Sequence, residues 1–252
     1  MSTRDERIAS IPKALAIIEA FSRETPSLTI SEAARRTGTT RASARRILLT
    51  LEGLGYAGTE QGRFYLRPSI LRLGFAYLSS SPVRDAATSY LEGLAERFEE
   101  SCSVAVLDAD EIVYVARMPA RRIMTITLAV GARLPAYCTS LGRVLLASLT
   151  PDDLDQYFER VKPTRLTEYT VTKPAELRRL IARAQQNGYA VVDQEREVGV
   201  RSVAVPLLDA SGRTAAAINI SAHASRVSMK ALESTYLTAL RDAADQISAR
   251  LI

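Results

Sequence analysis

Apolar residues between positions 30 and 55 recur at helical spacing on both sides of a short turn. One helical face is formed by residues three or four positions apart, at Ala44, Ile47, Leu48, Leu51 and Leu54. Gly38 is suited to end a preceding helix in the left-handed conformation. Ser31 can cap that first helix, and either Thr39 or Thr40 can cap the second. The pattern therefore predicts a helix-turn-helix.

The second of these helices has an exposed face that is small and cationic at its N-terminal end. At about 100° per residue, Ala42, Arg45 and Arg46 point away from the apolar face, and Arg41 lies on the flank. An arginine can bind a guanine edge with two hydrogen bonds or contact a phosphate. Most charge runs are only solvated surfaces, but here the turn, the caps and the charges agree. We therefore predict that double-stranded DNA contacts Thr39, Thr40, Arg41, Ala42, Ser43, Arg45 and Arg46.

A further helix is predicted before this pair, at residues 10–21. Ser10 is its candidate cap, and Leu15, Ile18 and Phe21 are expected to face inward. These residues would close the core of a small N-terminal domain.

Alternating residues predict a β-hairpin at residues 56–67, directly after the pair. Glu60-Gln61-Gly62 forms its turn, and Phe64 and Leu66 point inward. A hairpin in this place is the wing of a winged helix. Arg63, beside the turn, is expected to contact the DNA backbone or minor groove, with an ordinary surface arginine as the alternative.

Residues 68–82 are predicted to form an apolar helix that joins two parts of the chain. Pro68 opens it, and its apolar residues cover more than one face, at Ile70, Leu71, Leu73, Phe75, Tyr77 and Leu78. Such a helix is expected to bury surface against a partner chain as well as its own. The pattern thus predicts a homodimer, with Ser79-Ser-Ser-Pro82 as the candidate linker.

The remaining residues combine strands at hairpin spacing with helices at both ends. Helices are expected at 83–99, 140–149, 151–158, 174–187 and about 228–250. Strands are expected at 102–107, 111–117, 123–128, 189–193, 202–208 and 214–221. This order predicts an α+β domain with a mainly antiparallel sheet.

Charge is distributed unequally along the chain. Residues 1–80 hold 12 Arg or Lys and 7 Asp or Glu, and residues 81–252 hold 21 of each, so the formal net charge of +5 lies in the N-terminal third. A basic small domain beside a neutral larger one is typical of a nucleic-acid module joined to a domain with another task. The size of the neutral part argues against a purely architectural DNA-binding protein.

Composition argues against several other classes. No apolar run reaches the ~18 residues of a membrane span, and the N-terminal residues lack the apolar stretch of a secretory signal, so no membrane partner is expected. Two cysteines, Cys102 and Cys138, form no disulfide framework, which favours the cytoplasm. With a single histidine, His223, the chain shows no familiar metal-site spacing. We expect neither a metal nor a cofactor.

Longer stretches of the sequence resemble a known family. Asp193–Pro206, followed by Asp209–Gly212 and Ala217–Ser221, is similar to the effector-domain signature of the IclR family of bacterial transcription regulators. Arg117–Ile126 and Gly131–Ala147 resemble its PcaR, PcaU and PobR subgroup, which regulates the catabolism of protocatechuate, 4-hydroxybenzoate and β-ketoadipate. Thr40 is a departure, because many members have proline at the start of the recognition helix.

The resemblance implies a winged helix-turn-helix at residues 1–67, a linker helix at 68–82 and a GAF-like effector-binding domain at 83–252. It also implies dimers through the N-terminal region, often paired into tetramers. A two-fold dimer calls for a palindromic or pseudo-palindromic operator. The protein would regulate aromatic-acid catabolism in response to a small anionic metabolite. The alternative is an IclR-type regulator of another pathway with a different small carboxylate as effector.

The effector pocket is expected near the start of the apolar helix at Ser140, where free backbone N–H groups can bind an anion. The resemblance adds positions from other segments. The complete set of expected effector-binding residues is Ile123, Ile126, Leu134, Tyr137, Cys138, Thr139, Ser140, Leu141, Gly142, Asp193, Val200, Arg201, Ser202, Asn219 and Ser221.

Because a guanidinium matches a carboxylate with two hydrogen bonds, the candidate partners of the effector are Arg121, Arg122, Arg133 and Arg201. For each of them, the alternative is a structural ion pair with Asp193, Glu195 or Glu197. His223 is expected to be a surface or hydrogen-bonded residue rather than a ligand contact.

Catalysis is the remaining alternative. Cys138, His223 and Asp193 could be assembled on paper as a nucleophile, a base and an orienting group. Their spacing does not support this, and the sequence holds no G-x-S-x-G elbow, H-E-x-x-H motif, P-loop or dinucleotide fingerprint. We therefore expect a regulator and not an enzyme.

Overall fold

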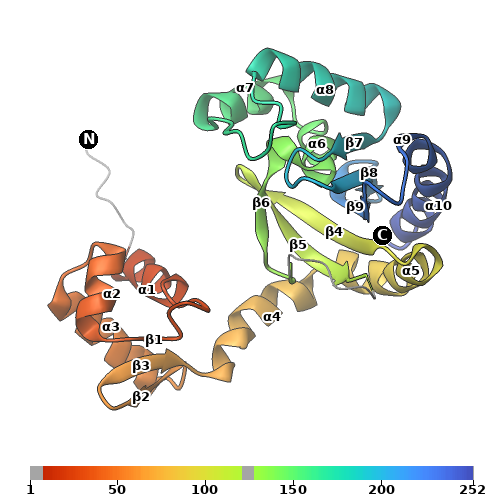
Figure 1. The fold of residues 1–252 in the computed structure, drawn as a ribbon. Helices are drawn as coiled ribbons and strands as arrows, with labels where there is room; N and C mark the ends of the chain where they lie inside the picture. Colours follow the sequence, from red (N-terminus) through yellow and green to blue (C-terminus); the bar gives the residue numbers. More distant parts are fainter. Residues whose placement is uncertain (1–7, 121–127, 252) are drawn as a thin grey trace. The chain divides into compact units, whose positions relative to one another are not determined.

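The chain divides into two compact units, residues 1–77 and 78–252 (Figure 1). The structure is a computed structural model, and it describes residues 8–120 and 128–251. The division falls inside the segment predicted to be a linker helix. Searched over those two ranges, the helices include none that is long and apolar enough to cross a membrane.

The smaller unit packs helices against a small antiparallel sheet. Its elements are, in order, α1 (Ser10–Glu19), β1 (Ser27–Leu28), α2 (Ile30–Thr37), α3 (Arg41–Gly53), β2 (Ala57–Glu60) and β3 (Arg63–Leu66). The strand order is β1-β3-β2. Ile17, Leu48 and Phe64 belong to the core between helices and sheet.

The predicted helix-turn-helix is confirmed, but its first cap is displaced. Gly38 follows α2 in the left-handed conformation with φ of 66°, and the Thr40 side chain caps α3 by accepting a hydrogen bond from the Ser43 amide. The cap of α2 is Thr29 and not Ser31. Thr29 and Glu32 form a capping box, in which each side chain accepts a hydrogen bond from the other residue's backbone N–H. This Thr-x-x-Glu spacing starts two residues before the predicted cap.

Some predictions about the helix ends and the buried face of α1 are wrong. Leu54 is 65% exposed, because α3 ends at Gly53 before this position can reach the core. In α1, Ile17 is fully buried while Leu15 is 49% exposed, so the inward face is rotated from the predicted one. Ser10 is the first residue of α1 rather than its cap, and no side chain caps this helix.

Strands β2 and β3 form the predicted hairpin. Glu60 pairs with Arg63, so Gln61 and Gly62 make the connection. Both residues have positive φ values, 49° and 77°. This combination is that of a type I′ turn, whose twist matches the flanking strands. Phe64 is buried as predicted.

A 3₁₀ turn at Pro68–Ile70 leads into α4 (Leu71–Ser80). None of the residues of α4 is buried, and Leu71, Leu73 and Phe75 are exposed. The predicted linker is largely helical, because α4 continues to Ser80 and α5 (Pro82–Phe98) begins two residues later.

The larger unit is built on one sheet in the order β6-β5-β4-β9-β8-β7. Its strands are β4 (Ser101–Asp108), β5 (Glu111–Met118), β6 (Arg133–Pro135), β7 (Ala190–Asp193), β8 (Val200–Leu208) and β9 (Thr214–His223). Each neighbouring pair runs antiparallel. The predicted α+β fold, a winged helix-turn-helix followed by a domain with an antiparallel sheet, is confirmed.

Strand β6 was not predicted. It pairs with β5 through Leu134 and Ile112, and its three residues are too few to show an alternating pattern. The strand expected at 123–128 falls outside the described residues except for Leu128, which belongs to no strand.

Helices cover both faces of this sheet (Figure 1). One face packs against α5 and α10 (Leu237–Ser248), and the other against α6 (Ser140–Leu146), α7 (Pro151–Arg160) and α8 (Pro174–Asn187). The predicted closing helix consists of α9 (Met229–Ala231), a π-helical stretch and α10. Because side chains alternate along a strand, Ile218 and Ile220 of β9 face α10, while Ala217 faces α6.

Candidate functional site

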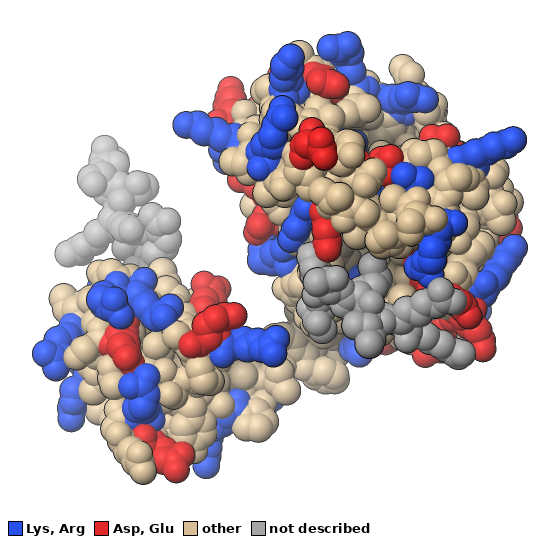
Figure 2. All heavy atoms as spheres, viewed as in Figure 1, with Lys and Arg blue, Asp and Glu red and all other residues tan. Residues whose placement is uncertain are grey.

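The N-terminal end of α3 presents basic side chains to solvent. Arg41, Ala42, Arg45 and Arg46 are exposed, whereas Ala44 between them is buried. No ion pair within the described part of the chain engages the three arginines. Figure 2 shows basic side chains spread over the surface of this unit. The helix thus has the exposed cationic face that the sequence predicted for a DNA-reading element.

Threonine side chains hold the turn in front of this face. The Thr40 hydroxyl is used to cap α3, and the hydroxyls of Thr37 and Thr39 lie 3.0 Å apart. Thr39, Thr40 and Ser43 therefore shape the turn from which the arginines project. Their contact with DNA stays a prediction.

Arg63 lies on the wing, but its guanidinium is engaged within the unit. Nη2 donates to the Glu32 carboxylate at 2.9 Å and to the Ser27 carbonyl at 3.0 Å, and Nε donates to the Ser27 hydroxyl at 3.0 Å. Arg63 thus ties the wing to β1 and to the capping box of α2. This structural role was not foreseen, and the DNA contact of Arg63 stays a prediction.

Replacing Arg63 by alanine is expected to lower the free energy of unfolding of the smaller unit by about 0.5–1 kcal/mol. The loss is small because the two charged side chains are 43% and 35% exposed and therefore screened by water. Denaturant unfolding measures it. Arg67→Ala, in the residue that follows β3, is the control, and an equal loss in both variants would contradict the assigned role.

A pocket opens on the face of the large sheet that α6 covers. The lining residues are Ser101, Tyr114, Arg117, Leu128, Leu134, Cys138, Thr139, Val192, Arg196, Glu197, Val200, Ser202, Asn219 and Ser221. The predicted effector-binding residues among them are Leu134, Cys138, Thr139, Val200, Ser202, Asn219 and Ser221. The structure therefore brings together residues from segments far apart in the sequence.

Small hydroxyl side chains form the floor of this pocket. Ser101 on β4 lies opposite Ser221 on β9, and Ser221 lies opposite Ser202 on β8, so the three hydroxyls make one row across the strands. Asn219 follows in the next row and donates from Nδ2 to the Ser221 hydroxyl at 3.0 Å. Its Oδ1 is buried and accepts no hydrogen bond from any described residue. The floor thus offers space and an unused acceptor.

Arg117 brings a cation into the pocket from β5. Nη1 donates to the Ser103 hydroxyl at 3.0 Å, and Nη2 donates to the Ser101 hydroxyl at 3.3 Å. Nε is buried and has no acceptor, and no carboxylate of the described residues pairs with this guanidinium. Burial lowers the pKa of Arg117, but the group stays charged at neutral pH. A half-buried cation without an anion among the described residues loses part of its hydration, which makes Arg117 a natural partner for an anionic ligand.

A second cation reaches the pocket from the segment 194–199, which connects β7 to β8. Arg196 on this segment is half-buried and lines the pocket, and Glu197 beside it is the acidic residue of the lining. Burial raises the pKa of Tyr114, and the nearby charges of Arg117 and Arg196 oppose that rise. The Arg117 guanidinium carbon lies 5.9 Å from the centre of the Tyr114 ring, and Arg196 lines the same pocket.

At the start of α6, one of the three amides expected to bind an anion is already used within the protein, and the anion site stays a prediction. The Gly142 amide donates to the hydroxyl of Thr139 at 3.0 Å, and Ser140 is buried and donates to the Ser202 hydroxyl at 2.8 Å. Leu141 is a core residue. A side chain at Gly142 would collide with the backbone of Ala136. Ser140, Leu141 and Gly142 are absent from the pocket lining, and the Thr139 hydroxyl takes up the Gly142 amide that an anion could use.

Three further predicted residues are directed elsewhere. The Tyr137 hydroxyl donates to the Thr164 carbonyl at 2.9 Å. Arg201 pairs with Asp193 at 3.0 Å and donates to the Val227 carbonyl at 2.8 Å. For Arg201 the alternative of a structural ion pair is therefore confirmed.

Of the other candidate arginines, the structure describes Arg133, which is also directed elsewhere. Arg133 pairs with Asp108 and Glu111 at the protein surface. Four predicted residues lie outside the described part of the chain, namely Arg121, Arg122, Ile123 and Ile126.

The side chains considered for catalysis have other environments. Burial raises the pKa of Cys138 to about 11 and that of Cys102 to about 12, so both are neutral thiols at neutral pH. His223 lies at the exposed end of β9 and contacts the Ser225 hydroxyl at 2.7 Å. Within residues 8–120 and 128–251, no group of His, Cys, Asp and Glu could hold a metal ion.

Sequence reasoning missed Arg117, Arg196, Ser101 and Tyr114. Alternation along β4 could have indicated Ser101, because Ser101 and Ser103 are polar while Cys102 between them is apolar. Arg117 enters the pocket only through the pairing of β5 with β4, which no pattern along the sequence reveals.

Comparison with known proteins identifies the family. The model of the IclR helix-turn-helix domain matches residues 10–60, and that of the bacterial transcriptional regulator IclR C-terminal domain matches residues 75–249. Together these matches include the exposed face of α3 and every residue that lines the pocket.

Individual relatives agree with this result. The Pca regulon regulatory protein of Pseudomonas putida is 43% identical over 92% of this chain and 80% of its own length. The p-hydroxybenzoate hydroxylase transcriptional activator of Acinetobacter baylyi is 36% identical over 96% of this chain and 92% of its own. A crystal structure of an IclR homologue from Microbacterium hydrocarbonoxydans, complexed with 4-hydroxybenzoate, is 25% identical, with a TM-score of 0.82 over 96% of this chain and 98% of that one.

These matches exclude the enzyme alternative and assign DNA binding to the helix-turn-helix. The chain belongs to the IclR family of bacterial transcriptional regulators.

Proposed function

We propose that this regulator controls genes of aromatic-acid catabolism in response to a small aromatic carboxylate that binds in the pocket of the larger unit. The first candidates are 4-hydroxybenzoate and protocatechuate, followed by β-ketoadipate. The names of the Pseudomonas and Acinetobacter relatives support the pathway, and the ligand of the Microbacterium homologue supports the class of effector.

The observation that carries the proposal is a pair of buried polar atoms on residues that line the pocket. Among the described residues, Arg117 Nε has no acceptor and Asn219 Oδ1 has no donor. A carboxylate supplies the acceptor, and a ring hydroxyl supplies the donor. Leu128 and Leu134 offer apolar contacts for the ring between them. A hydroxybenzoate carries both of these groups on one rigid ring.

Thermal melting and calorimetry with matched ligands test this proposal. We expect 4-hydroxybenzoate and protocatechuate to raise the melting midpoint, because a ligand at 100 times its Kd stabilises the folded state by about 2.7 kcal/mol. Benzoate, which lacks the hydroxyl, should bind about 10-fold more weakly, because it leaves Asn219 unpaired. p-Cresol, which lacks the carboxylate, should bind least. Equal binding of p-cresol, or no acid binding below millimolar concentration, would contradict the proposal.

The effector is expected to change the affinity for DNA. A ligand shifts a conformational equilibrium only by its differential affinity for the two states, and such couplings are typically about 1–3 kcal/mol. The covalent path from the pocket to α3 runs through α5 and α4. These helices are where the two states should differ.

The exposed apolar residues of α4 support assembly into a homodimer that binds a palindromic or pseudo-palindromic operator. Leu71 and Phe75 are 71% and 61% exposed, and Leu73 is also exposed. A cluster of large apolar side chains on one surface helix is typical of an interface. Two-fold symmetry would then present two copies of α3 to two half-sites.

The double substitution Leu73→Glu and Phe75→Glu is expected to convert the dimer into a monomer, because two carboxylates would be buried in the interface. Sedimentation velocity measures the change in mass. Arg72→Glu, on the same helix, is the control and should leave the assembly intact. A monomeric unaltered protein would refute the proposed interface.

A further inference from the structure

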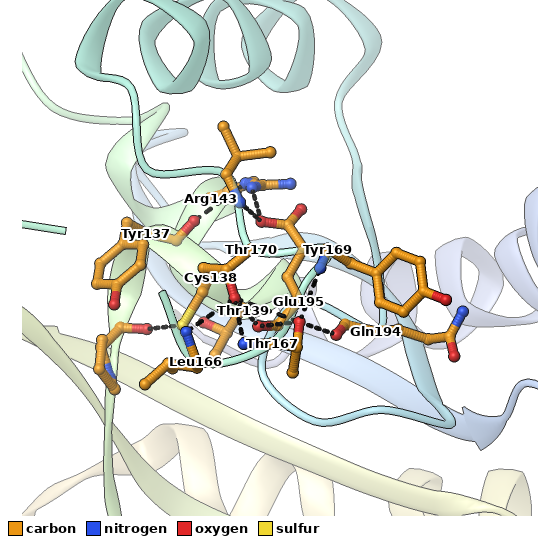
Figure 3. Close-up of polar contacts among 12 residues, drawn as sticks. Tyr137, Cys138, Thr139, Arg143, Leu166, Thr167, Tyr169, Thr170, Gln194 and Glu195 are labelled. Atoms are coloured by element: carbon orange, nitrogen blue, oxygen red, sulfur yellow. Dashed lines mark hydrogen bonds and ion pairs between the residues drawn. The ribbon is translucent and has the colours of Figure 1, made fainter. Parts of the chain in front are cut away.

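A buried ion pair lies directly behind the pocket wall (Figure 3). Arg143 on α6 and Glu195 on the segment 194–199 approach to 2.7 Å, and their side chains are only 3% and 7% exposed. Neither residue lines the pocket. Burying two charges carries a large desolvation cost, so the pair must be held by further hydrogen bonds.

Each partner of this ion pair holds the backbone beside a pocket residue. Arg143 Nε donates to the Tyr137 carbonyl at 3.1 Å, and the next residue, Cys138, lines the pocket. Glu195 immediately precedes Arg196, which also lines the pocket. One ion pair thus connects two wall segments that are far apart in the sequence.

Residues 164–171 form hydrogen bonds with the segment 194–199 (Figure 3). The Thr167 hydroxyl donates to the Gln194 carbonyl, and the Thr170 hydroxyl donates to the Glu195 carbonyl, both at 2.7 Å. The Val171 amide donates to the Glu195 carboxylate at 3.1 Å. The backbone and side chain of Glu195 are therefore fixed together.

The backbone conformation of Gln194 indicates that surrounding contacts constrain the segment 194–199. Its φ is 59°, in the left-handed region that a residue with a side chain rarely adopts. Such a conformation persists where surrounding contacts impose it. The Gln194 side-chain oxygen accepts from the Gly199 amide at 3.0 Å, and the Gln194 amide donates to the Val200 carbonyl at 2.8 Å, which closes the segment on itself.

We propose that Arg143, Glu195 and Thr167 are positioning residues, which fix the segment 194–199 so that Arg196 faces the effector. This inference rests on the proposed function of the pocket. A guanidinium on a loose segment would have to be ordered when the ligand binds, and that ordering weakens affinity. The network orders Arg196 beforehand without contacting the ligand.

The test uses Thr167→Val, an isosteric change outside the pocket that removes the 2.7 Å hydrogen bond to the Gln194 carbonyl. It also removes the longer contacts of that hydroxyl with the Glu195 carbonyl, the Thr170 hydroxyl and the Tyr169 amide. Thr164→Val is the matched control, because it lies in the same turn and contacts neither Gln194 nor Glu195. Hydrogen exchange is measured for the full chain without ligand. We expect the amides of Gln194 and Gly199 to exchange about 3- to 10-fold faster in Thr167→Val only, the effect of one neutral hydrogen bond.

Calorimetry with 4-hydroxybenzoate then separates positioning from general stability. Thr167→Val is expected to weaken binding about 3- to 10-fold. In an Arg196→Ala background the same change should have almost no effect, because the residue to be positioned is gone. Additive losses in this double-mutant cycle would overturn the proposal, and so would unchanged exchange in Thr167→Val.

The two proposals can fail separately. If the unaltered protein binds no aromatic acid, the proposed function fails, while hydrogen exchange still decides whether Thr167 fixes the segment. If the acid binds but Thr167→Val behaves like Thr164→Val in both measurements, the pocket assignment survives and the positioning role is wrong.

Discussion

An Arg117→Met variant is expected to lose about 10- to 100-fold in affinity for 4-hydroxybenzoate, the effect of removing a hydrogen bond to a charged group. The free energy of unfolding without ligand should change by less than about 1 kcal/mol. Methionine gives up the hydrogen bonds to Ser101 and Ser103. It also removes a half-buried charge that has no anionic partner among the described residues, and the two effects oppose each other. Calorimetry and denaturant unfolding measure the two quantities.

Arg213→Met is the control for this substitution, because Arg213 is an exposed arginine of the same unit, far along the sheet from the pocket lining. It should leave the affinity for the acid unchanged. A large loss of stability in Arg117→Met, with binding reduced only in proportion to the folded fraction, would show that Arg117 is a structural residue. Unchanged affinity would remove the central argument for a carboxylate effector.

The triple substitution of Arg41, Arg45 and Arg46 by alanine is expected to reduce specific DNA affinity by at least about 100-fold, since each arginine that reads a base contributes about 1–3 kcal/mol. The probe is a duplex selected from a random pool by the unaltered protein. Fluorescence anisotropy at several salt concentrations measures affinity and salt dependence. Each replaced arginine that contacts a phosphate should reduce by about one the slope of log affinity against log salt concentration.

A control with the same change in net charge separates local contacts from overall attraction. Arg160, Arg178 and Arg213 are exposed arginines of the larger unit, and their joint replacement by alanine should leave DNA affinity nearly unchanged. Equal losses in the two triple variants would attribute binding to net charge alone. Full affinity of the α3 variant would show that another surface reads the DNA.

The helix-turn-helix could be predicted from the sequence because its determinants are local. The spacing of Ala44, Ile47 and Leu48 sets the buried face, and Gly38 sets the turn, all within a few residues. The errors also have local causes. Thr29 competes with Ser31 as a cap and is chosen because Glu32 stands three residues after it, which completes the capping box.

The pocket could be predicted only in part. The resemblance named Cys138, Ser202 and Asn219 as effector-binding residues, and the structure places all three in the pocket lining. The groups that determine its chemistry depend on which strands pair and in which register. Arg117 reaches the floor because β5 pairs with β4, and Arg143 meets Glu195 across 52 positions of sequence. Contacts of this kind leave no periodic signal along the chain.

Because side chains alternate along β9, the residues that stabilise the fold differ from the residues that line the pocket. On β9, Ile218 and Ile220 fill the core against α10, while Asn219 and Ser221 between them shape the pocket. Under the proposed function, a mutation at Asn219 or Ser221 alters which molecule is recognised, while Ile218 and Ile220 keep the domain folded. In related proteins, ligand recognition can therefore change through single substitutions of pocket-facing residues. The core-facing residues, and with them the stability of the domain, stay the same at each step.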